Sequence, residues 1–207
     1  MKQAETLLQM EYGVSSLPAP GEVESGDLHL VSTIPTGTLI AVVDGSGHGH
    51  EAALAARLAV ATLEGHRREG VIPLVRRCHE RLKGTRGVVM SLASIDGAEN
   101  TVTWLGVGNI EGILVRTSAS VDPNVETIFL RPGVVGYRLP ALQAVITPIG
   151  PGDLLILTTD GIRSDFTRHF SSEDSPEKIA DYISSNFRKG NDDGLVLVAR
   201  YLGSNDE

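Results

Sequence analysis

The order of strand and helix signals constrains the fold of this chain more than any other feature. Two apolar, β-branched runs at 28–34 and 38–43 flank Pro35-Thr36-Gly37, a sequence typical of a hairpin turn. Asp96-Gly97 separates a later pair of runs in the same way. Strand signals occur in all at 28–34, 38–43, 88–95, 101–107, 110–116, 127–130, 143–147, 154–157 and 195–201.

Helical periodicity, by contrast, is confined to separate blocks. An apolar stripe recurs every three to four residues at 50–68, and a second helix is expected at 73–83. Ser175 and Pro176 are a good N-cap and first residue for a third helix. Consecutive hairpins with segregated helices favour an α+β fold over a doubly wound parallel sheet. We therefore expect a four-layer αββα sandwich, in which helices flank two stacked antiparallel sheets.

Length and composition fit one compact domain. The 207 residues favour a single domain spanning 1–207. Apolar residues make up 41% of the chain and aromatic residues only 4%, so the core is aliphatic, which suits a sheet covered by helices. The net charge is −8 and no long run of Lys and Arg occurs, which argues against a nucleic-acid or membrane partner.

Cysteine usage and the N-terminal sequence bear on the compartment. Cys78 is the only cysteine, so no internal disulfide is possible, which fits a reducing cytosol. Its place on the apolar side of the expected helix favours inert packing over catalysis. Residues 1–5 lack a signal-peptide core, and no apolar run reaches membrane-spanning length. We expect a cytoplasmic protein that acts as a monomer.

Acidic residues beside glycine mark the ends of several expected strands. Asp44 and Asp160 each follow an apolar run and precede glycine, Asp192-Asp193 precedes Gly194, and Asp27 opens a strand. Any one of these sites alone is explained by a turn, because Asp-Gly is a common turn sequence. Taken jointly, they suggest carboxylates gathered at one sheet edge, which is costly unless cations are present. Hard divalent ions such as Mg²⁺ or Mn²⁺ prefer such oxygen ligands.

The stretch from Asp44 to Glu51 fits other kinds of site less well. A P-loop would have a lysine and a hydroxyl residue where His50-Glu51 follow, and the glycine spacing differs from a dinucleotide fingerprint. His48 and His50 could bind zinc, but an H-x-H pair without a third soft ligand nearby is a weak signal. Ser46 is not in a nucleophile elbow, although a catalytic triad elsewhere stays open.

Four motifs in order resemble the metal-dependent serine/threonine protein phosphatases (type 2C), especially their bacterial branch typified by the sporulation phosphatase SpoIIE. The stretch 44–49 is similar to the Asp-Gly-x-Gly-x-Gly metal motif of that family. Residues 25–27 resemble its upstream Gly-Gly-Asp, 158–161 its Thr-Asp-Gly, and 191–193 its closing acidic pair. The resemblance covers about 27–201 and implies the αββα sandwich expected above.

The resemblance also implies a centre with two Mn²⁺ or Mg²⁺ ions. Asp44 would bridge both ions and Gly45 would contribute its carbonyl. Asp160 and Asp192 would hold one ion. Asp27 would act through a water molecule or through contact with a ligand, without binding an ion directly. Asp192 is preferred to its neighbour because the first position of the closing pair is the family ligand.

The activity implied is hydrolysis of phosphoserine or phosphothreonine on partner proteins. For compact members of this branch, the partners implied are phosphorylated STAS-domain proteins of a bacterial stressosome. Asp44 and Asp27 would then serve catalysis through the ions, and His48 is a candidate acid for the leaving oxygen. Two alternatives stay open, namely a catalytically weak binding module with a phosphatase fold and a hydrolase of small phosphoesters.

Some positions depart from the pattern of the family. Leu195 stands where threonine is frequent, and Ser25 stands where glycine is usual. No arginine precedes Asp27 to hold the phosphate, as one does in eukaryotic relatives. The irregular stretch 117–140 could serve substrate recognition or be a plain connector.

Overall fold

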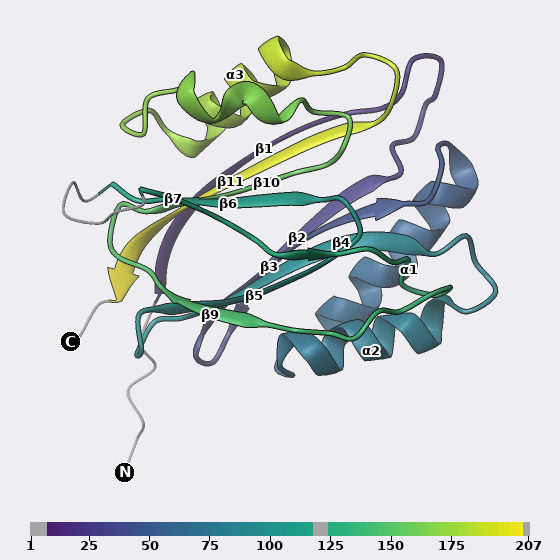
Figure 1. Cartoon of the computed structure of the whole chain (residues 1–207), viewed down its shortest axis with the longest axis horizontal. Coiled ribbons are helices and arrows are strands. Elements are labelled where there is room, and N and C mark those ends of the chain that lie inside the picture. Colours follow the sequence, from purple (N-terminus) through teal and green to yellow (C-terminus); the bar gives the residue numbers. More distant parts are fainter. Residues whose placement is uncertain (1–7, 118–123, 205–207) are drawn as a thin grey trace.

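The computed structural model describes residues 8–117 and 124–204, and its elements stack in four layers (Figure 1). One sheet has the strand order β1-β11-β10-β6-β7 and the other the order β2-β3-β4-β5-β8, with β9 also paired to β5. The strands of the first sheet are β1 (Leu8–Leu17), β6 (Glu111–Val115), β7 (Val125–Thr127), β10 (Leu154–Thr158) and β11 (Gly194–Ser204). Those of the second are β2 (Asp27–Ile34), β3 (Gly37–Gly45), β4 (Val88–Asp96), β5 (Thr101–Val107), β8 (Leu130–Arg131) and β9 (Val145–Pro148).

Helices cover the two outer faces of this pair of sheets. Helices α1 (His50–Gly65) and α2 (Val71–Leu82) pack on the sheet that contains β2 to β5. Helix α3 (Pro176–Phe187) packs on β1 and β11, next to the short 3₁₀ helix η1 (Ser164–Arg168). The predicted αββα sandwich is therefore confirmed, and the strand pairs are antiparallel except for the short β5–β8 pair.

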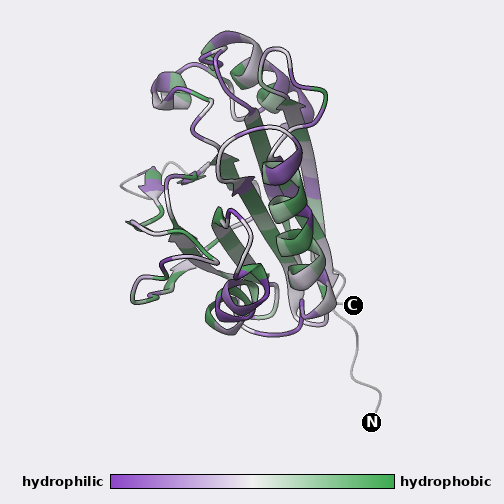
Figure 2. Cartoon of the chain, turned by 90° about the vertical axis from the view of Figure 1, so that its right-hand side faces the viewer, coloured by the Kyte–Doolittle hydropathy of each residue, from purple (hydrophilic) through white to green (hydrophobic). Residues whose placement is uncertain are grey.

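The central strands are apolar on both faces because each lies between two layers. In β3, Leu39, Ala41 and Val43 face the helices, whereas Ile40 and Val42 face the opposite sheet. The same alternation holds in β10 and β11, whose residues divide between the inter-sheet core and the core under α3. Figure 2 shows these strands among the most hydrophobic parts of the molecule.

Most element boundaries agree with the sequence expectations. Ser175 caps α3, its hydroxyl accepting a hydrogen bond from the Lys178 amide at 3.4 Å, and Pro176 is the first helical residue as expected. Helix α2 begins two residues before the expected Pro73, since Gly70 is its N-cap. Cys78 is buried in the core between α2 and the sheet, and burial raises the pKa of its thiol to about 12.

Two parts of the strand prediction are wrong. The run 127–130 was expected to be one strand, but the chain crosses here from β7 in one sheet to β8 in the other. Buried Ile128 fills the inter-sheet core at the crossing, a place that local alternation cannot reveal. Strand β1 was not predicted at all, although it pairs along the whole of β11. Residues 118–123 of the expected loop 117–140 lie outside the described residues.

In the described part of the chain, no helix combines the length and the apolar character that crossing a membrane requires.

Candidate metal centre

The strand ends that carry the predicted ligands meet at one end of the sandwich. Asp27, the first residue of β2, lies directly opposite Asp44, near the end of β3, in the antiparallel register. Asp160 follows β10, and Asp192 precedes β11, its antiparallel neighbour. The two sheets are joined at this end by the Thr159 hydroxyl, which donates a hydrogen bond of 2.7 Å to Asp27 Oδ2. Motifs more than a hundred residues apart in the sequence therefore form one site.

Glycines allow the backbones of these segments to pack in contact. The Gly45 amide donates a hydrogen bond of 3.0 Å to the Gly26 carbonyl. A Cβ on Gly45 would lie 2.1 Å from the Ala52 carbonyl oxygen, and a Cβ on Gly161 would lie 1.8 Å from that of Asp193. Both contacts are far too short, so only glycine fits at these two positions. The Asp-Gly pairs thus serve close packing at the site as well as turns.

Burial and like charge together perturb the carboxylates. Burial raises the pKa of Asp44 to about 9, and the charges of Asp27, Asp160 and Asp192 add to the rise. Burial likewise raises the pKa of Asp27 to about 7, opposed by the hydrogen bond from Thr159 and assisted by the neighbouring carboxylates. Carboxylates placed directly opposite one another in a sheet are destabilising by themselves. The cluster therefore holds a strong negative potential that a cation would neutralise.

The donor set fits a hard, partly hydrated divalent cation. Among the described residues, no three His, Cys, Asp or Glu side chains already surround a common point as a ready metal cage. The charges of Asp27, Asp160 and Asp192 nevertheless reach Asp44 and raise its pKa. Such a loose cluster suits Mg²⁺, which commonly binds through one or two carboxylates and keeps several waters. No soft ligand belongs to the cluster, so the chemistry of the site matches Mg²⁺ or Mn²⁺ better than zinc.

The two neighbouring aspartates before β11 have different roles. The Asp193 side chain is 4% exposed and accepts hydrogen bonds from the amides of Ala19 at 2.7 Å and Gly26 at 2.9 Å. It therefore holds the segment between β1 and β2 against the site. Asp192 is half-buried and accepts one bond of 2.9 Å from the Asp193 amide, so most of its acceptor capacity remains for a ligand. This difference supports the choice of Asp192 as the ligand.

The two histidines lie at the rim and face the segment 22–24. His48 has a 66% exposed side chain, and its Nδ1 lies 2.7 Å from Glu22 Oε1. His50 Nδ1 lies 3.4 Å from Glu24 Oε1, and Glu24 also pairs with Arg57. Neither histidine is among the groups that shift the pKa of Asp27 or Asp44. The structure thus gives His48 a carboxylate partner that the sequence did not suggest.

Three further residues at the site were missed by sequence reasoning. Thr159 bonds to Asp27 and also accepts a 2.9 Å hydrogen bond from the Leu195 amide. Asn109 Nδ2 donates to Asp160 Oδ2 at 2.8 Å, and the only signal in the sequence is its place after Gly108 between two strands. Arg86 lies beside the loop after Asp44, since a Cβ on Gly47 would lie 2.8 Å from Arg86 Nη1. A cationic side chain from the turn before β4 therefore lies beside the loop that follows Asp44.

Comparison with known proteins agrees with this geometry. The sequence profile of the family described as Stage II sporulation protein E (SpoIIE) matches residues 35–202. The phosphoserine phosphatase RsbX of Bacillus subtilis (strain 168) is 25% identical over 204 residues, which are 97% of this chain and 99% of RsbX.

Two solved structures share nearly the whole fold. One, described as "The bacterial stressosome: a modular system that has been adapted to control secondary messenger signaling", is 30% identical with a TM-score of 0.84, over 93% of this chain and all of that one. A crystal structure of RsbX in complex with magnesium is 22% identical with a TM-score of 0.80, over 94% of this chain and all of that one. The chain therefore belongs to the SpoIIE family and is a phosphatase with the PP2C fold.

Proposed function

We propose that this protein removes phosphate from phosphoserine or phosphothreonine in STAS-domain proteins of a stressosome. The observation that carries the proposal is the convergence of Asp27, Asp44 and Asp160 at one end of the sandwich, where the charges of Asp27 and Asp160 add to the burial that raises the pKa of Asp44. The choice of substrate is supported by two similarities of nearly the whole chain. One is to a phosphoserine phosphatase, and the other is to a structure described in terms of the stressosome.

The proposed roles follow from the position of each side chain. Two ions, Mn²⁺ or Mg²⁺, would be held by the carboxylates of Asp44, Asp160 and Asp192 and the carbonyl of Gly45, with Asp27 acting through water. When bound, such ions lower the pKa of a water molecule and neutralise charge on the phosphoryl oxygens. The protein groups orient this site, because Thr159 and Asn109 each fix one carboxylate by a hydrogen bond.

His48 is proposed to protonate the leaving serine or threonine oxygen. In the protonated ring both nitrogens carry a proton, so Nδ1 can donate to Glu22 while Nε2 remains to serve as the acid. Replacement by glutamine should slow phosphoserine hydrolysis much more than p-nitrophenyl phosphate hydrolysis, because p-nitrophenolate leaves without a proton. Equal slowing of both substrates would rule out this role.

The decisive experiment measures phosphate release from a phosphorylated STAS-domain protein with and without Mn²⁺ or Mg²⁺. We expect metal-dependent release, and Asp44→Asn should reduce it by roughly a hundredfold or more while the variant stays folded. Near-normal turnover by Asp44→Asn with Mn²⁺ present would contradict the site. Metal binding without hydrolysis would identify a binding module, and preference for a nucleotide or sugar phosphate would identify a small-molecule phosphoesterase.

The proposal includes the setting in which the enzyme works. Residues 1–207 are proposed to form one phosphatase domain that acts as a monomer in the cytoplasm. Static light scattering of the purified protein and fractionation of cells that express it would test these two points.

A further inference from the structure

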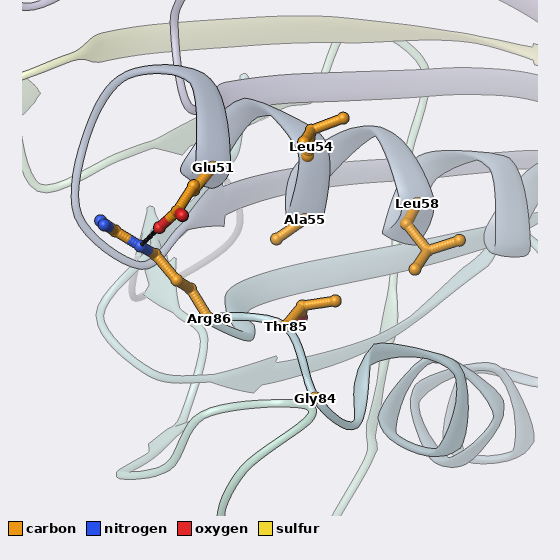
Figure 3. A pocket seen from close by; sticks show the side chains of 7 residues that line it. All are labelled: Glu51, Leu54, Ala55, Leu58, Gly84, Thr85 and Arg86. Carbon is orange, nitrogen blue, oxygen red and sulfur yellow. Dashed lines mark hydrogen bonds and ion pairs between the residues drawn. The ribbon is translucent and has the colours of Figure 1, made fainter.

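A groove of about 630 Å³ opens between helix α1 and the turn that joins α2 to β4 (Figure 3). Leu54, Ala55 and Leu58 form its wall on α1, and the turn 84–86 forms the wall that faces them. Leu54 is 49% exposed although it is a large apolar side chain on an otherwise well-packed helix. The groove is therefore an apolar depression that is open to solvent.

One end of this groove adjoins the loop of the metal centre. Arg86 lines the groove and also lies against Gly47, three residues after Asp44. The two backbones are joined next to this contact, because the Ser46 amide donates a 3.1 Å hydrogen bond to the Gly87 carbonyl. A chain that leaves the metal centre past Arg86 would therefore enter the groove directly.

The charge at this end suits a phosphorylated chain. Arg86 Nε donates a 2.6 Å hydrogen bond to Glu51 Oε2, and both side chains are exposed, at 48% and 66%. An exposed ion pair of this kind contributes little free energy, so the guanidinium can reorient toward a stronger partner. A phosphate dianion is such a partner, since arginine binds it through two parallel hydrogen bonds.

We propose that the groove docks the segment of the protein substrate that flanks its phosphorylated residue. An apolar side chain of that segment lies between Leu54 and Leu58, while Arg86 faces the phosphate at the metal centre. The two leucines are four residues apart, about 6 Å along the helix, which corresponds to roughly two residues of an extended peptide. This proposal rests on the proposed phosphatase function and adds to it a preference for substrates with an apolar residue near the phosphorylated one.

The test uses seven-residue phosphoserine peptides that carry one leucine, moved from position to position on either side of the phosphoserine. For the wild-type protein with Mn²⁺, we expect leucine at one or two positions to lower KM about tenfold while kcat changes little, as burial of such a side chain implies. Leu54→Ser should abolish this preference. Leu202→Ser is the matched control, because Leu202 is a 38% exposed leucine near the far end of β11 from the metal centre.

A charge variant provides a second readout that separates the two parts of the groove. Arg86→Gln should raise KM for every phosphopeptide by a similar factor and leave the leucine preference in place. Loss of the leucine preference in Leu54→Ser with retention in Arg86→Gln and Leu202→Ser is the result that supports docking.

Three results would overturn the proposal. The first is a flat leucine scan in the wild-type protein, and the second is the same scan for Leu54→Ser as for Leu202→Ser. The third is a wild-type dimer that becomes a monomer in Leu54→Ser, which would make the groove an interface between two copies of the chain. If no phosphoserine substrate is hydrolysed, the proposed function fails separately. Fluorescence anisotropy with the same peptides then decides docking, which stands if leucine-dependent binding is lost in Leu54→Ser and falls if it is not.

Discussion

At the scale of single residues, identical neighbours in the sequence take different roles because of their backbone surroundings. Asp192 and Asp193 are adjacent aspartates, yet only Asp193 is buried and held by two backbone amides. Sequence reasoning chose Asp192 as the ligand by resemblance to a family pattern. The structure adds a physical reason, because the Asp193 carboxylate is already engaged with Ala19 and Gly26.

The asparagine variants of this pair should therefore behave differently. Asp193→Asn places an amide donor against the Ala19 and Gly26 amides, which should lower the free energy of unfolding by about 1–3 kcal/mol. Asp192→Asn should leave stability nearly unchanged and weaken the metal activation constant by roughly tenfold or more. Urea unfolding and metal titration of activity measure the two effects. Each variant serves as the control for the other, and an exchange of the two phenotypes would contradict the assignment.

At the scale of elements, strand ends position the proposed ligands at one end of the sandwich. An ion-pair network connects the two sheets at the opposite end. Arg116 follows β6, and its side chain is only 6% exposed. It donates to Asp153, 5% exposed, at 3.0 Å and to Glu126 in β7 at 2.5 Å, and it also bonds to the Pro148 carbonyl in β9. This one side chain therefore connects both sheets far from the metal centre.

Removal of this arginine should destabilise the fold without affecting the chemistry. Arg116→Ala leaves the Asp153 carboxylate buried without its cation, so we expect a loss of about 3–5 kcal/mol in unfolding free energy. Lys83→Ala is the control, since its pair with Glu80 is exposed and should contribute little to stability. Thermal or urea unfolding measures the loss. A change for Arg116→Ala as small as that of the control would show that the network does not hold the sheets together.

At the scale of the whole molecule, folding brings carboxylates together in a buried place, where their ionised forms are unfavourable. Burial raises the pKa of Asp27 to about 7 and that of Asp44 to about 9, and repulsion from the neighbouring carboxylates that the two sheets bring together adds to both rises. The folded state then holds protons that the unfolded chain, with ordinary aspartate pKa values, has already released. Stability is therefore greatest at low pH for these two groups and is lost as the pH rises toward their folded pKa values.

The melting temperature of the protein in chelator should fall between about pH 5 and about pH 9. Mg²⁺ or Mn²⁺ should reduce or reverse this slope, because cations favour the ionised carboxylates. His29, whose pKa is lowered by burial, contributes in the opposite sense around its usual 6.5. The readout is therefore the difference between the parent and Asp44→Asn, measured by calorimetry. Parallel curves for the two proteins in chelator would disprove the electrostatic account.

The sequence by itself determined the local features of this protein. Apolar, β-branched runs on either side of a turn sequence located the hairpin of β2 and β3, and capping chemistry located the start of α3, because these signals depend on neighbouring residues. Four Asp motifs in order indicated the family and the metal centre. Strand β1 was not predicted because Gly13 interrupts its pattern of strand-forming residues. Glycine is required there, since a Cβ would lie 2.3 Å from the Glu177 backbone in α3.

Only the tertiary structure decided which distant residues share the site. The crossing from β7 to β8, the hydrogen bond of Asn109 to Asp160 and the place of Arg86 beside Gly47 depend on how the sheets stack. The pairing of His48 with Glu22 likewise depends on Asp193, which fixes the segment between β1 and β2. Local sequence preferences act over a few residues, whereas these contacts join segments set side by side by the burial of two sheets in a common core.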